Sequence, residues 1–510
     1  MPPKVIKKLP PCPRVLTNEY KEKIRQHSYL GKKGYTIPKS VLEKWDELEI
    51  KEECTMIPFT NTRCAGNAES TKFFVFREND NKLYIPRFYG IERYGLPCRS
   101  DIPQGLAIDC QFSGHLRPIQ IPIVDTYLKQ VSGGSGGGIL EAGCGVGKTA
   151  MGIYIASVLK KKTLILVHKE FLMNQWIERI HAFLPTAKIG IIQADVFDIE
   201  GKDLVIGMIQ TMYRKDFSTS GIGEFGLTIV DEVHRIGSEE FSKTLLHVST
   251  PYMLGISATV ERKDRLTRIL YMYIGPKIYS CERETTDTVV VRGLKYVSRD
   301  EKFNEMEYDF RGNPKYSTMI SKLCNFVPRS RFILGVLKDL INEDENAQII
   351  VLCHNICLLE YLYRELGVEN FATFGYYKGG MKKEQLKESE DKQIVLGSYS
   401  MASEGLDIPT LSTLVLATPK TDIVQCVGRI LRVKRAKPIV VDIIDSHDTF
   451  RNQWNKRKAY YRKCKYEIFM GTSIYDCQPL MSRHTKQTDV EYNEDIQTNQ
   501  CNVILDDDHE

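Results

Sequence analysis

Short apolar runs alternate with longer helical segments over residues 114–275. The runs are typical of buried strands, whereas the segments between them carry apolar residues at helical spacing, as in Glu170 to Phe183. Strands separated by helices predict a parallel, doubly wound sheet, because each parallel connection has to cross over the sheet. The predicted strands are Thr163–Val167, Lys188–Ile192, Leu204–Gly207, Leu227–Val230 and Met253–Ser257.

A second alternating set of the same kind lies between residues 330 and 466. Strands again alternate with helices, so the chain is predicted to contain two α/β lobes in series. The predicted strands of this second lobe are Gln348–Cys353, Asn370–Phe374, Gln393–Gly397, Thr413–Ala417 and Pro438–Ile443.

The remaining segments are predicted from weaker patterns. Phe73–Phe76 and Lys82–Tyr89 read as short strands around the turn Glu78–Asn81, which favours a small α+β accessory domain at the start of the chain. Gly312-Asn313-Pro314 interrupts the segment between the lobes, and the end of the chain is polar and acidic. The predicted domains are 1–105 (accessory), 106–280 (first lobe), 281–328 (connector), 329–470 (second lobe) and 471–510 (tail).

Composition narrows the class of protein. A chain of 510 residues with 42% hydrophobic and 26% charged residues is long enough for about three globular domains. It contains no apolar run of the ~20 residues that a membrane helix needs, and its basic start lacks the apolar stretch of a secretory signal. The 14 cysteines form no Cys-x-x-Cys pair, so we expect reduced thiols. Because the apolar run and the secretory signal are missing, we expect an intracellular protein without a membrane role.

Three features can be interpreted either as structural or as functional. Cys353, His354 and Cys357 could hold a metal, but they continue an apolar strand, which favours packing. The glycines from Gly133 to Gly138 precede a strand instead of following one, which favours a flexible loop over a phosphate site. Basic clusters such as Lys160–Lys162 fit either solvated surface or contact with a phosphate backbone.

The segment from Ala142 to Thr149 has the spacing of a phosphate-binding loop between a strand and a helix. Backbone N–H groups of Gly143, Cys144, Gly145, Val146 and Gly147 would close around a triphosphate. Lys148 would reach its β- and γ-phosphates, and the Thr149 hydroxyl would ligate Mg²⁺. ATP and Mg²⁺ are therefore the predicted substrate and cofactor.

Two carboxylates follow the apolar run Leu227–Val230, at the end of a predicted parallel strand where ligands usually bind. Asp231 is the predicted second Mg²⁺ residue, and Glu232 is the candidate general base for the attacking water. An Asp-Glu pair alone is more often a helix start, but the upstream Lys148 favours catalysis.

Arg429 and Arg432 lie at positions i and i+3 and can share one helical face. They are candidate arginine fingers, since phosphoryl transfer develops negative charge that cations stabilise. Because both belong to the second lobe, hydrolysis would require the lobes to close, which couples chemistry to movement.

The set of motifs over residues 114–466 resembles superfamily 2 helicases. The segments that carry the resemblance to motifs I, II, III, V and VI are Ala142–Thr149, Asp231–His234, Ser257–Thr259, Glu404–Pro409 and Gln425–Arg432. The resemblance implies two RecA-like lobes in tandem, an ATPase driven by nucleic acid, adenine near Gln120 and ribose near Asp407. It also implies that ATP state is coupled to nucleic-acid grip through His234, Ser257, Thr259 and Gln425. Val167–Trp176 and Gln210–Thr211 resemble motifs Ia and Ib, which contact the nucleic-acid backbone.

Within the superfamily, Leu254–Thr259 with Arg262 and Asp264 is similar to the XPB-type and restriction-enzyme-like DNA translocases. Size and motif order also resemble the transcript-release helicases of poxviruses and their counterparts in large cytoplasmic DNA viruses such as African swine fever virus. This resemblance implies 3′ to 5′ movement on DNA during viral transcription, with the transcription machinery as a partner. It implies a location in cytoplasmic viral factories and in the virion.

Two other hypotheses stay open at this point. An RNA helicase would use the same motifs, and the sequence does not distinguish RNA from DNA as the substrate. A scaffold with a vestigial ATP site is disfavoured, because the complete set of predicted catalytic residues is present: Lys148, Thr149, Asp231, Glu232, Arg429 and Arg432.

Overall fold

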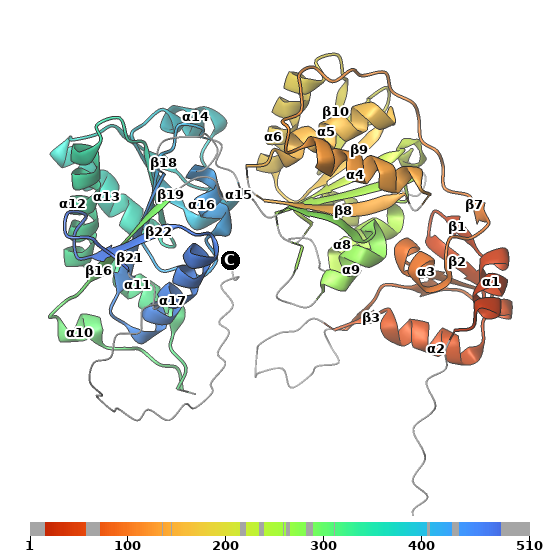
Figure 1. The fold of residues 1–510 in the computed structure, drawn as a ribbon, viewed down its shortest axis with the longest axis horizontal. Helices are drawn as coiled ribbons and strands as arrows, with labels where there is room; N and C mark the ends of the chain where they lie inside the picture. The colour runs from red at the N-terminus through yellow and green to blue at the C-terminus, as the bar shows by residue number, and fades with distance from the viewer. Residues whose placement is uncertain are drawn as a thin grey trace, which may run out of the picture. The chain divides into compact units, whose positions relative to one another are not determined.

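The computed structural model describes most of the chain, and its described residues divide into two compact units, one up to residue 282 and one after it. The described residues are 16–57, 72–134, 136–143, 145–214, 221–233, 239–258, 260–261, 266–281, 289–310, 312–404, 408–430 and 438–480. Each unit contains one eight-stranded, mainly parallel sheet with helices on its faces (Figure 1). The predicted fold class is therefore confirmed: two RecA-like doubly wound lobes in tandem with a small N-terminal α+β domain.

The first unit begins with a small α+β domain. Its mixed sheet has the order β5-β6-β2-β1-β7, and a two-stranded ribbon pairs β3 with β4. The strands are β1 (Tyr29–Gly31), β2 (Gly34–Pro38), β3 (Thr55–Met56), β4 (Phe73–Phe74), β5 (Arg77–Glu78), β6 (Lys82–Ile85) and β7 (Arg99–Ser100). The helices are α1 (Asn18–His27), α2 (Lys44–Glu53) and α3 (Arg87–Tyr94). The strand expected over Lys82–Tyr89 thus ends at Ile85 and a helix follows.

The large sheet of the first unit has the order β11-β10-β12-β9-β13-β14-β8-β15, and its pairings are parallel except that of β11. Its strands are β8 (Gly137–Ala142), β9 (Thr163–Val167), β10 (Ile189–Gln193), β11 (Val196–Phe197), β12 (Leu204–Met208), β13 (Leu227–Asp231), β14 (Tyr252–Ser257) and β15 (Lys277–Cys281). Every residue of β9 and β13 is buried, as expected for central parallel strands covered on both faces.

Helices cover both faces of this sheet. Helices α4, α5 and α6 pack on one face around one apolar cluster, and α8 and α9 pack on the other (Figure 1). Their bounds are α4 (Ile121–Ser132), α5 (Lys148–Leu159), α6 (Glu170–Phe183), α7 (Ile209–Arg214), α8 (Glu239–His247) and α9 (Thr267–Ile274). The predicted helix Glu170–Phe183 is confirmed in full.

The small domain and the first lobe share one hydrophobic core. The buried guanidinium of Arg87 donates to the carbonyl oxygens of Thr250 (2.9 Å) and Pro251 (3.0 Å) in the lobe. Gly137 lies in strand β8, and a Cβ there would come within 2.2 Å of the Phe88 ring. The expected flexible loop over Gly133–Gly138 is therefore wrong for Gly137 and Gly138, because these glycines make room for packed side chains.

The second unit repeats the architecture with the strand order β18-β19-β17-β20-β21-β16-β22-β23. Its strands are β16 (Val290–Tyr296), β17 (Ile349–Cys353), β18 (Phe374–Tyr377), β19 (Ile394–Ser398), β20 (Thr413–Leu416), β21 (Ile439–Asp445), β22 (Glu467–Gly471) and β23 (Gln478–Pro479). The predicted strand at Asn370–Phe374 is displaced and begins at Phe374. The segment expected as a connector supplies β16, which pairs in parallel with β21 and β22 inside the sheet.

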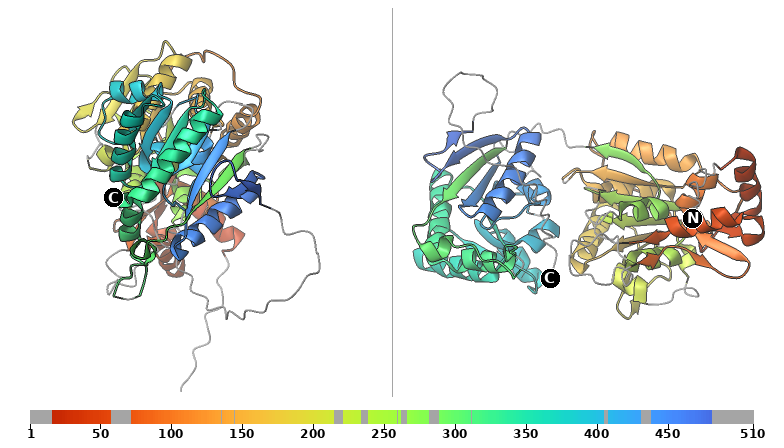
Figure 2. Two further views of the ribbon diagram at one scale, coloured as in Figure 1. Left: turned by 90° about the vertical axis from the view of Figure 1, so that its left-hand side faces the viewer. Right: turned by 90° about the horizontal axis from the view of Figure 1, so that it is seen from below.

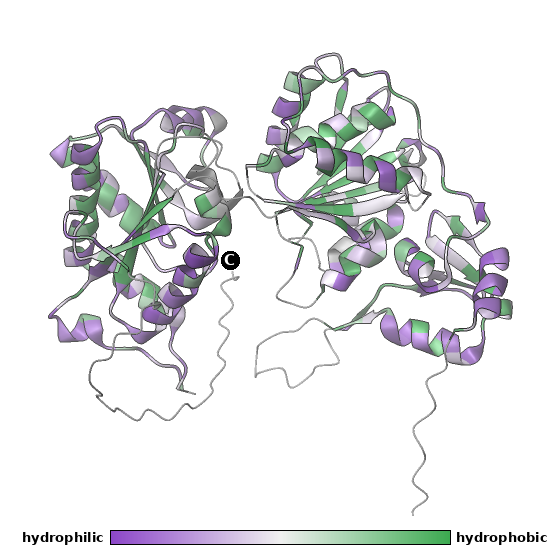
Figure 3. Ribbon diagram, in the orientation of Figure 1, coloured by the Kyte–Doolittle hydropathy of each residue, from purple (hydrophilic) through white to green (hydrophobic). Residues whose placement is uncertain are grey.

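Helices of the second unit lie on both faces of its sheet (Figure 2). Asn355 caps α13 by accepting from the Cys357 N–H at 3.2 Å, and Asn370 ends this helix in the left-handed conformation. The helices are α10 (Glu301–Asn304), α11 (Tyr316–Asn325), α12 (Val327–Glu343), α13 (Ile356–Glu369), α14 (Lys383–Glu390), α15 (Tyr399–Glu404), α16 (Val424–Ile430) and α17 (Asp448–Lys463). Figure 3 shows apolar residues gathered on the strands of both large sheets and hydrophilic residues along α1 and α17.

Two sequence expectations concern possible cofactors and membranes. The side chain of Cys353 is buried and its thiol lies 3.0 Å from the Asn355 carbonyl oxygen, while His354 Nδ1 lies 2.9 Å from the Thr418 hydroxyl. Within the described residues, no cluster of three or more His, Cys, Asp or Glu could hold a metal ion. The burial of Cys353 and the two contacts of this segment agree with the packing interpretation. The described helices include none that is long and apolar enough to cross a membrane.

Candidate nucleotide site

The predicted ATP residues of the first lobe meet at one edge of its sheet. Strands β8, β13 and β14 run parallel, with Asp231 opposite Ile256 and Ser257 opposite Glu141. Their carboxyl ends therefore lie side by side, at the edge where open α/β sheets bind ligands. The phosphate loop, the carboxylate pair and Ser257 all follow or end these strands.

The phosphate loop follows β8, where Ala142 is buried, and leads directly into α5. Gly145 and Gly147 adopt φ of 82° and 88°, the left-handed region that a residue with a side chain rarely enters. Gly147 caps α5, so the first N–H groups of a helix that begins at Lys148 point toward the loop. A helix N-terminus of this kind suits an anion such as phosphate. Gly143 and Val146 are described, whereas Cys144 lies outside the described residues.

The phosphate loop is hydrogen-bonded to Arg117 and Gln120, which precede α4 in the chain. Gln120, which is 3% exposed, donates through Nε2 to the Val146 carbonyl oxygen at 2.8 Å, and Arg117 donates to that of Gly145 at 2.9 Å. The Gln120 Oε1 accepts from the Arg117 N–H at 2.7 Å. A Cβ at Gly147 would lie 2.4 Å from Gln120 Nε2 and 2.6 Å from Arg117 Nη2. The Gln120 amide therefore holds the loop backbone, and its expected contact with adenine stays a prediction.

Asp231 ends strand β13 in a buried position, with both carboxylate oxygens hydrogen-bonded. Trp176 Nε1 donates to Oδ2 at 2.8 Å, and the Glu232 N–H donates to Oδ1 at 2.9 Å. Burial and the neighbouring Glu232 charge raise the Asp231 pKa to about 6, against the opposing influence of Lys148 and Trp176. Burying an ionised carboxylate without a counter-charge costs free energy, so the position of Asp231 suits a metal ion.

Lys148 and Glu232 bring the two motifs together. The Lys148 Nζ lies 3.2 Å from Glu232 Oε1, and both side chains are largely buried. Glu232 has a φ of 49°, an uncommon conformation for a residue with a side chain. Thr149 lies next to Lys148 in the first turn of α5 and is half-buried. The predicted Mg²⁺ and phosphate residues of this lobe thus surround one place, and their chemistry fits Mg·ATP.

Glu141 connects the phosphate-loop strand to the segment after Ser257. Its Oε1 accepts from the Val260 N–H at 2.9 Å, and its Oε2 accepts from Lys277 Nζ at 3.1 Å and from the Ser280 hydroxyl at 2.7 Å. Partial burial is the largest single influence on the Glu141 pKa and raises it. The hydrogen bonds and the Lys277 charge together outweigh burial, so the pKa lies below its ordinary value. Sequence reasoning missed Glu141, although a charged residue in the apolar strand Gly137–Ala142 was a signal.

The motif Ia and Ib segments each contain buried and exposed residues. Trp176, at the end of the motif Ia segment, is 1% exposed, and the expected contact of this segment with the nucleic-acid backbone stays a prediction. The Trp176 indole serves the Asp231 carboxylate. Gln210 is exposed and donates to the His168 carbonyl oxygen at 2.9 Å, and the Thr211 hydroxyl accepts from the Ala194 N–H at 3.0 Å.

Several predicted residues are not placed by the structure. His234, Thr259, Asp407 and Arg432 lie outside the described residues. Gln425 and Arg429 belong to α16, whose backbone is described without these side chains. The arginine-finger, ribose and most coupling assignments therefore stay predictions. Ser257 is placed, fully buried, at the end of β14.

Comparison with protein families gives two matches. Residues 113–262 match the family of the type III restriction enzyme, res subunit, and residues 333–437 match the helicase conserved C-terminal domain. The first match covers the phosphate loop and the carboxylate pair. The second covers strands β17 to β20 of the second unit.

Individual relatives agree with these families. The candidate ATP-dependent RNA helicase L396 of Acanthamoeba polyphaga mimivirus is 36% identical over 90% of this chain and 89% of its own length. The candidate ATP-dependent RNA helicase QP509L of African swine fever virus is 26% identical, over 71% and 75%. The DNA 3′-5′ translocase XPB2 of Sulfurisphaera tokodaii is 24% identical, over 64% and 81%. Among solved structures, a single-residue variant of S. cerevisiae Dbp5 bound to RNA and ADP BeF3 has a TM-score of 0.48 and 14% identity, covering 70% of this chain and 94% of that chain.

Proposed function

Since this chain belongs to the superfamily 2 ATP-dependent helicases, as its viral relative and the two family matches show, we propose that it is a 3′ to 5′ motor on DNA. The chain is an NTP hydrolase. The observation that carries the nucleotide part is the 3.2 Å approach of Lys148 to Glu232 beside the buried Asp231. These are the charges that a Mg²⁺-bound triphosphate requires.

Each predicted site residue has its own role in ATP hydrolysis. The loop N–H groups and Lys148 bind the phosphates, while Thr149 and Asp231 hold Mg²⁺, which neutralises charge on the phosphate oxygens when bound. Glu232 accepts a proton from the attacking water or orients it. Arg429 and Arg432 of the second lobe stabilise the charge that develops, so that the lobes close for each turnover.

The DNA assignment and its polarity rest on likeness to XPB2, which is named a DNA 3′-5′ translocase. RNA is the second candidate substrate, because the mimivirus and African swine fever virus relatives are named RNA helicases. Viral relatives also support a role in viral transcription, in termination or transcript release. In that role the transcription machinery is a partner and the cytoplasmic viral factory and the virion are the setting.

Steady-state ATPase of the full chain tests the proposal. The rate is measured without nucleic acid and with single-stranded DNA, duplex DNA and RNA of matched sequence, with Lys148→Ala as the control. Stimulation by DNA that Lys148→Ala abolishes supports the proposal. Preference for RNA moves the substrate to RNA, and the absence of stimulation by every nucleic acid overturns the motor in favour of a scaffold.

A further inference from the structure

The sheet of the N-terminal domain carries a row of polar and aromatic side chains on one face. Tyr29 of β1 is paired with Arg99 on one side and with Thr36 on the other, and Thr36 is paired with Tyr84 of β6. Side chains of directly paired residues point to the same face of a sheet. Tyr29 and Tyr84 are therefore two strands, or ~10 Å, apart on one face, with Thr36 between them. Strands β7, β1 and β2 of this sheet lie side by side in Figure 1.

The opposite face of the same sheet forms the core of the domain. Its apolar side chains are at most 3% exposed and belong to the shared core with α1 and α3: Leu30, Tyr35, Ile37, Leu83 and Ile85. Alternation along each strand therefore sends Tyr29 and Tyr84 away from the core, where both are half-buried. Their rings are not needed to fill the domain interior.

Cations surround the two rings. The Lys82 Nζ lies 5.2 Å from the Tyr29 ring centroid and 3.2 Å from its hydroxyl, and the Arg99 guanidinium carbon lies 5.4 Å from that centroid. The Lys33 Nζ lies 4.9 Å from the Tyr84 ring centroid. We call these five residues the tyrosine face. Among the described residues, the acid that pairs with these three cations is Asp101, which binds the largely exposed Arg99.

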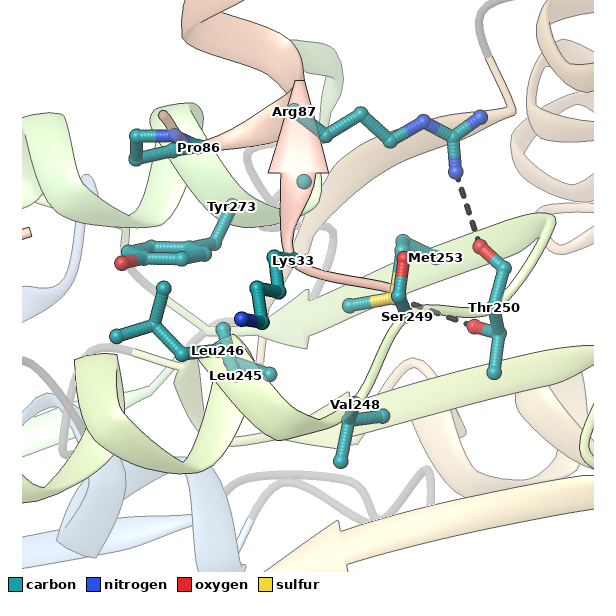
Figure 4. A pocket seen from close by; sticks show the side chains of 11 residues that line it. Lys33, Pro86, Arg87, Leu245, Leu246, Val248, Ser249, Thr250, Met253 and Tyr273 are labelled. Atoms are coloured by element: carbon teal, nitrogen blue, oxygen red, sulfur yellow. Dashed lines mark hydrogen bonds between the residues drawn. The ribbon is translucent and has the colours of Figure 1, made fainter. Parts of the chain in front are cut away.

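The tyrosine face has a fixed position relative to the first lobe. The Ser249 hydroxyl donates to the Gly31 carbonyl oxygen at 3.3 Å, next to the turn that carries Lys33. Lys33 also borders a small pocket, beside Leu245 and Leu246 of α8 (Figure 4). A ligand on the tyrosine face is therefore held beside the lobe that contains the phosphate loop.

We propose that the tyrosine face binds single-stranded nucleic acid. Unstacked bases pack on the rings of Tyr29 and Tyr84, while Lys33, Lys82 and Arg99 contact the phosphates. Interleaved aromatic and cationic side chains suit this polymer, since every nucleotide presents a flat base and a negative charge. A duplex keeps its bases stacked on one another and offers none to the rings. This inference rests on the proposed function, because a motor that separates or follows strands supplies the single strand.

The test measures binding directly, by fluorescence anisotropy of labelled oligonucleotides with the full chain in the absence of nucleotide. Single-stranded DNA, single-stranded RNA and duplex DNA of matched sequence are compared across a salt series. The variants are Tyr29→Leu/Tyr84→Leu, Tyr29→Phe/Tyr84→Phe and Lys33→Gln/Lys82→Gln. Tyr308→Leu, which alters a tyrosine that is 54% exposed in the other unit, is the matched control. Thermal melting confirms that each variant is folded.

The tyrosine face predicts a distinct result for each variant. Tyr29→Leu/Tyr84→Leu weakens single-strand binding at least ~10-fold, because base–aromatic stacking contributes at that scale, whereas the phenylalanine variant and Tyr308→Leu bind normally. Lys33→Gln/Lys82→Gln lowers the slope of log affinity against log salt by about 1.4, or ~0.7 per phosphate contact. The tighter of the DNA and RNA arms identifies the polymer.

Three results would overturn the inference. Unchanged binding by the leucine variant would show that the bases do not stack on the two rings, and an effect of the lysine variant alone would show electrostatic contact with the phosphates without stacking. An equal loss on duplex DNA removes the preference for single strands. The proposed function has its own test: it fails if no nucleic acid stimulates the wild-type ATPase. The binding assay tests the tyrosine face whether or not the ATPase is stimulated.

Discussion

The indole N–H of Trp176 donates a hydrogen bond to Oδ2 of Asp231 at 2.8 Å, and so links helix α6 to the predicted Mg²⁺ residue. Trp176→Phe keeps an aromatic ring in the core but removes the donor. A hydrogen bond to a charged group contributes about 1.5–3 kcal/mol, so we expect the Mg²⁺ concentration for half-maximal ATPase to rise at least ~10-fold. Trp454→Phe, in the core of the second unit, is the control and should leave the Mg²⁺ requirement unchanged. An unchanged requirement in Trp176→Phe would contradict an orienting role.

The raised pKa of Asp231 predicts an effect on stability as well as on activity. The folded state binds this proton more tightly than the unfolded state does, because the ordinary pKa of 3.8 rises to about 6. The stabilisation from the protonated carboxyl is therefore present below pH ~3.8 and is lost as the pH rises through ~6. Without Mg²⁺, Asp231→Asn should raise the free energy of unfolding at pH 8 by on the order of 3 kcal/mol and have no effect near pH 3.

Urea denaturation at both pH values measures this difference, and an equal effect of Asp231→Asn at pH 3 and pH 8 would contradict it. Catalysis supplies a second measurement with the wild-type chain. At limiting Mg²⁺, ATPase should fall as the pH drops below ~6, because the protonated carboxyl no longer holds the ion. Added Mg²⁺ should restore part of the rate.

The sequence predicted the parts of the fold that local pattern determines. The β9 strand Thr163–Val167 and the α6 helix Glu170–Phe183 are found where the apolar spacing places them. β16 was missed, because Val290–Tyr296 has only alternating burial and its partners β21 and β22 lie more than a hundred residues away in the chain. Pairing across such a separation leaves no mark in a local window.

The residues of the candidate site also fall into two groups, those that a sequence motif identifies and those that only a long-range contact identifies. Lys148, Asp231 and Glu232 could be predicted because the spacing of phosphate-loop and carboxylate motifs reflects fixed chemistry. Trp176 and Glu141 act through contacts with residues 55 and 119 positions away. Such contacts depend on the order of strands in the sheet, and a single sequence does not reveal that order.

Glu232 is predicted to be the base, and its removal should separate ATP binding from hydrolysis. Glu232→Gln keeps the shape of the side chain and an oxygen near Lys148, but it cannot take a proton. We expect the stimulated ATPase rate to fall at least ~100-fold while ATP still binds, so that the variant traps its nucleotide. Nucleotide-binding titration together with single-turnover hydrolysis measures the two steps. Lys148→Ala should instead abolish hydrolysis, and full stimulated turnover in Glu232→Gln would reject this mechanism.

Glu141 is expected to transmit the effect of nucleic acid to the ATP site. Its contact with the Val260 N–H fixes the residue after Thr259, to which the helicase resemblance assigns coupling. Glu141→Ala should lower the stimulation of ATPase by nucleic acid about 10-fold while the basal rate changes little, since this side chain is not expected to contact the phosphates. Lys277→Met is the control, because it leaves the contact between Glu141 and Val260 in place. A proportional loss of basal and stimulated rates would show that Glu141 supports the phosphate loop alone.

The second unit contains a buried ion pair whose loss should be costly. Arg329 and Asp445 are both inaccessible to solvent and form two hydrogen bonds, of 2.6 and 2.8 Å, and Arg329 also donates to the Ala417 carbonyl oxygen. Arg329→Met leaves Asp445 buried without its cation, so we expect a loss of about 3–5 kcal/mol in the free energy of unfolding of this unit. Lys338→Met breaks the exposed pair between Lys338 and Glu369 and should cost less than ~1 kcal/mol.

Urea denaturation of the full chain, followed by a probe in the second unit, measures both losses. The double variant Arg329→Met/Asp445→Leu removes both charges and restores an apolar contact. Because most of the penalty in Arg329→Met comes from the uncompensated carboxylate, the double variant should recover most of the lost stability. If it is as unstable as Arg329→Met, the cost arises from lost packing of the arginine stem and its bond to Ala417, and the charge of Asp445 is not its source.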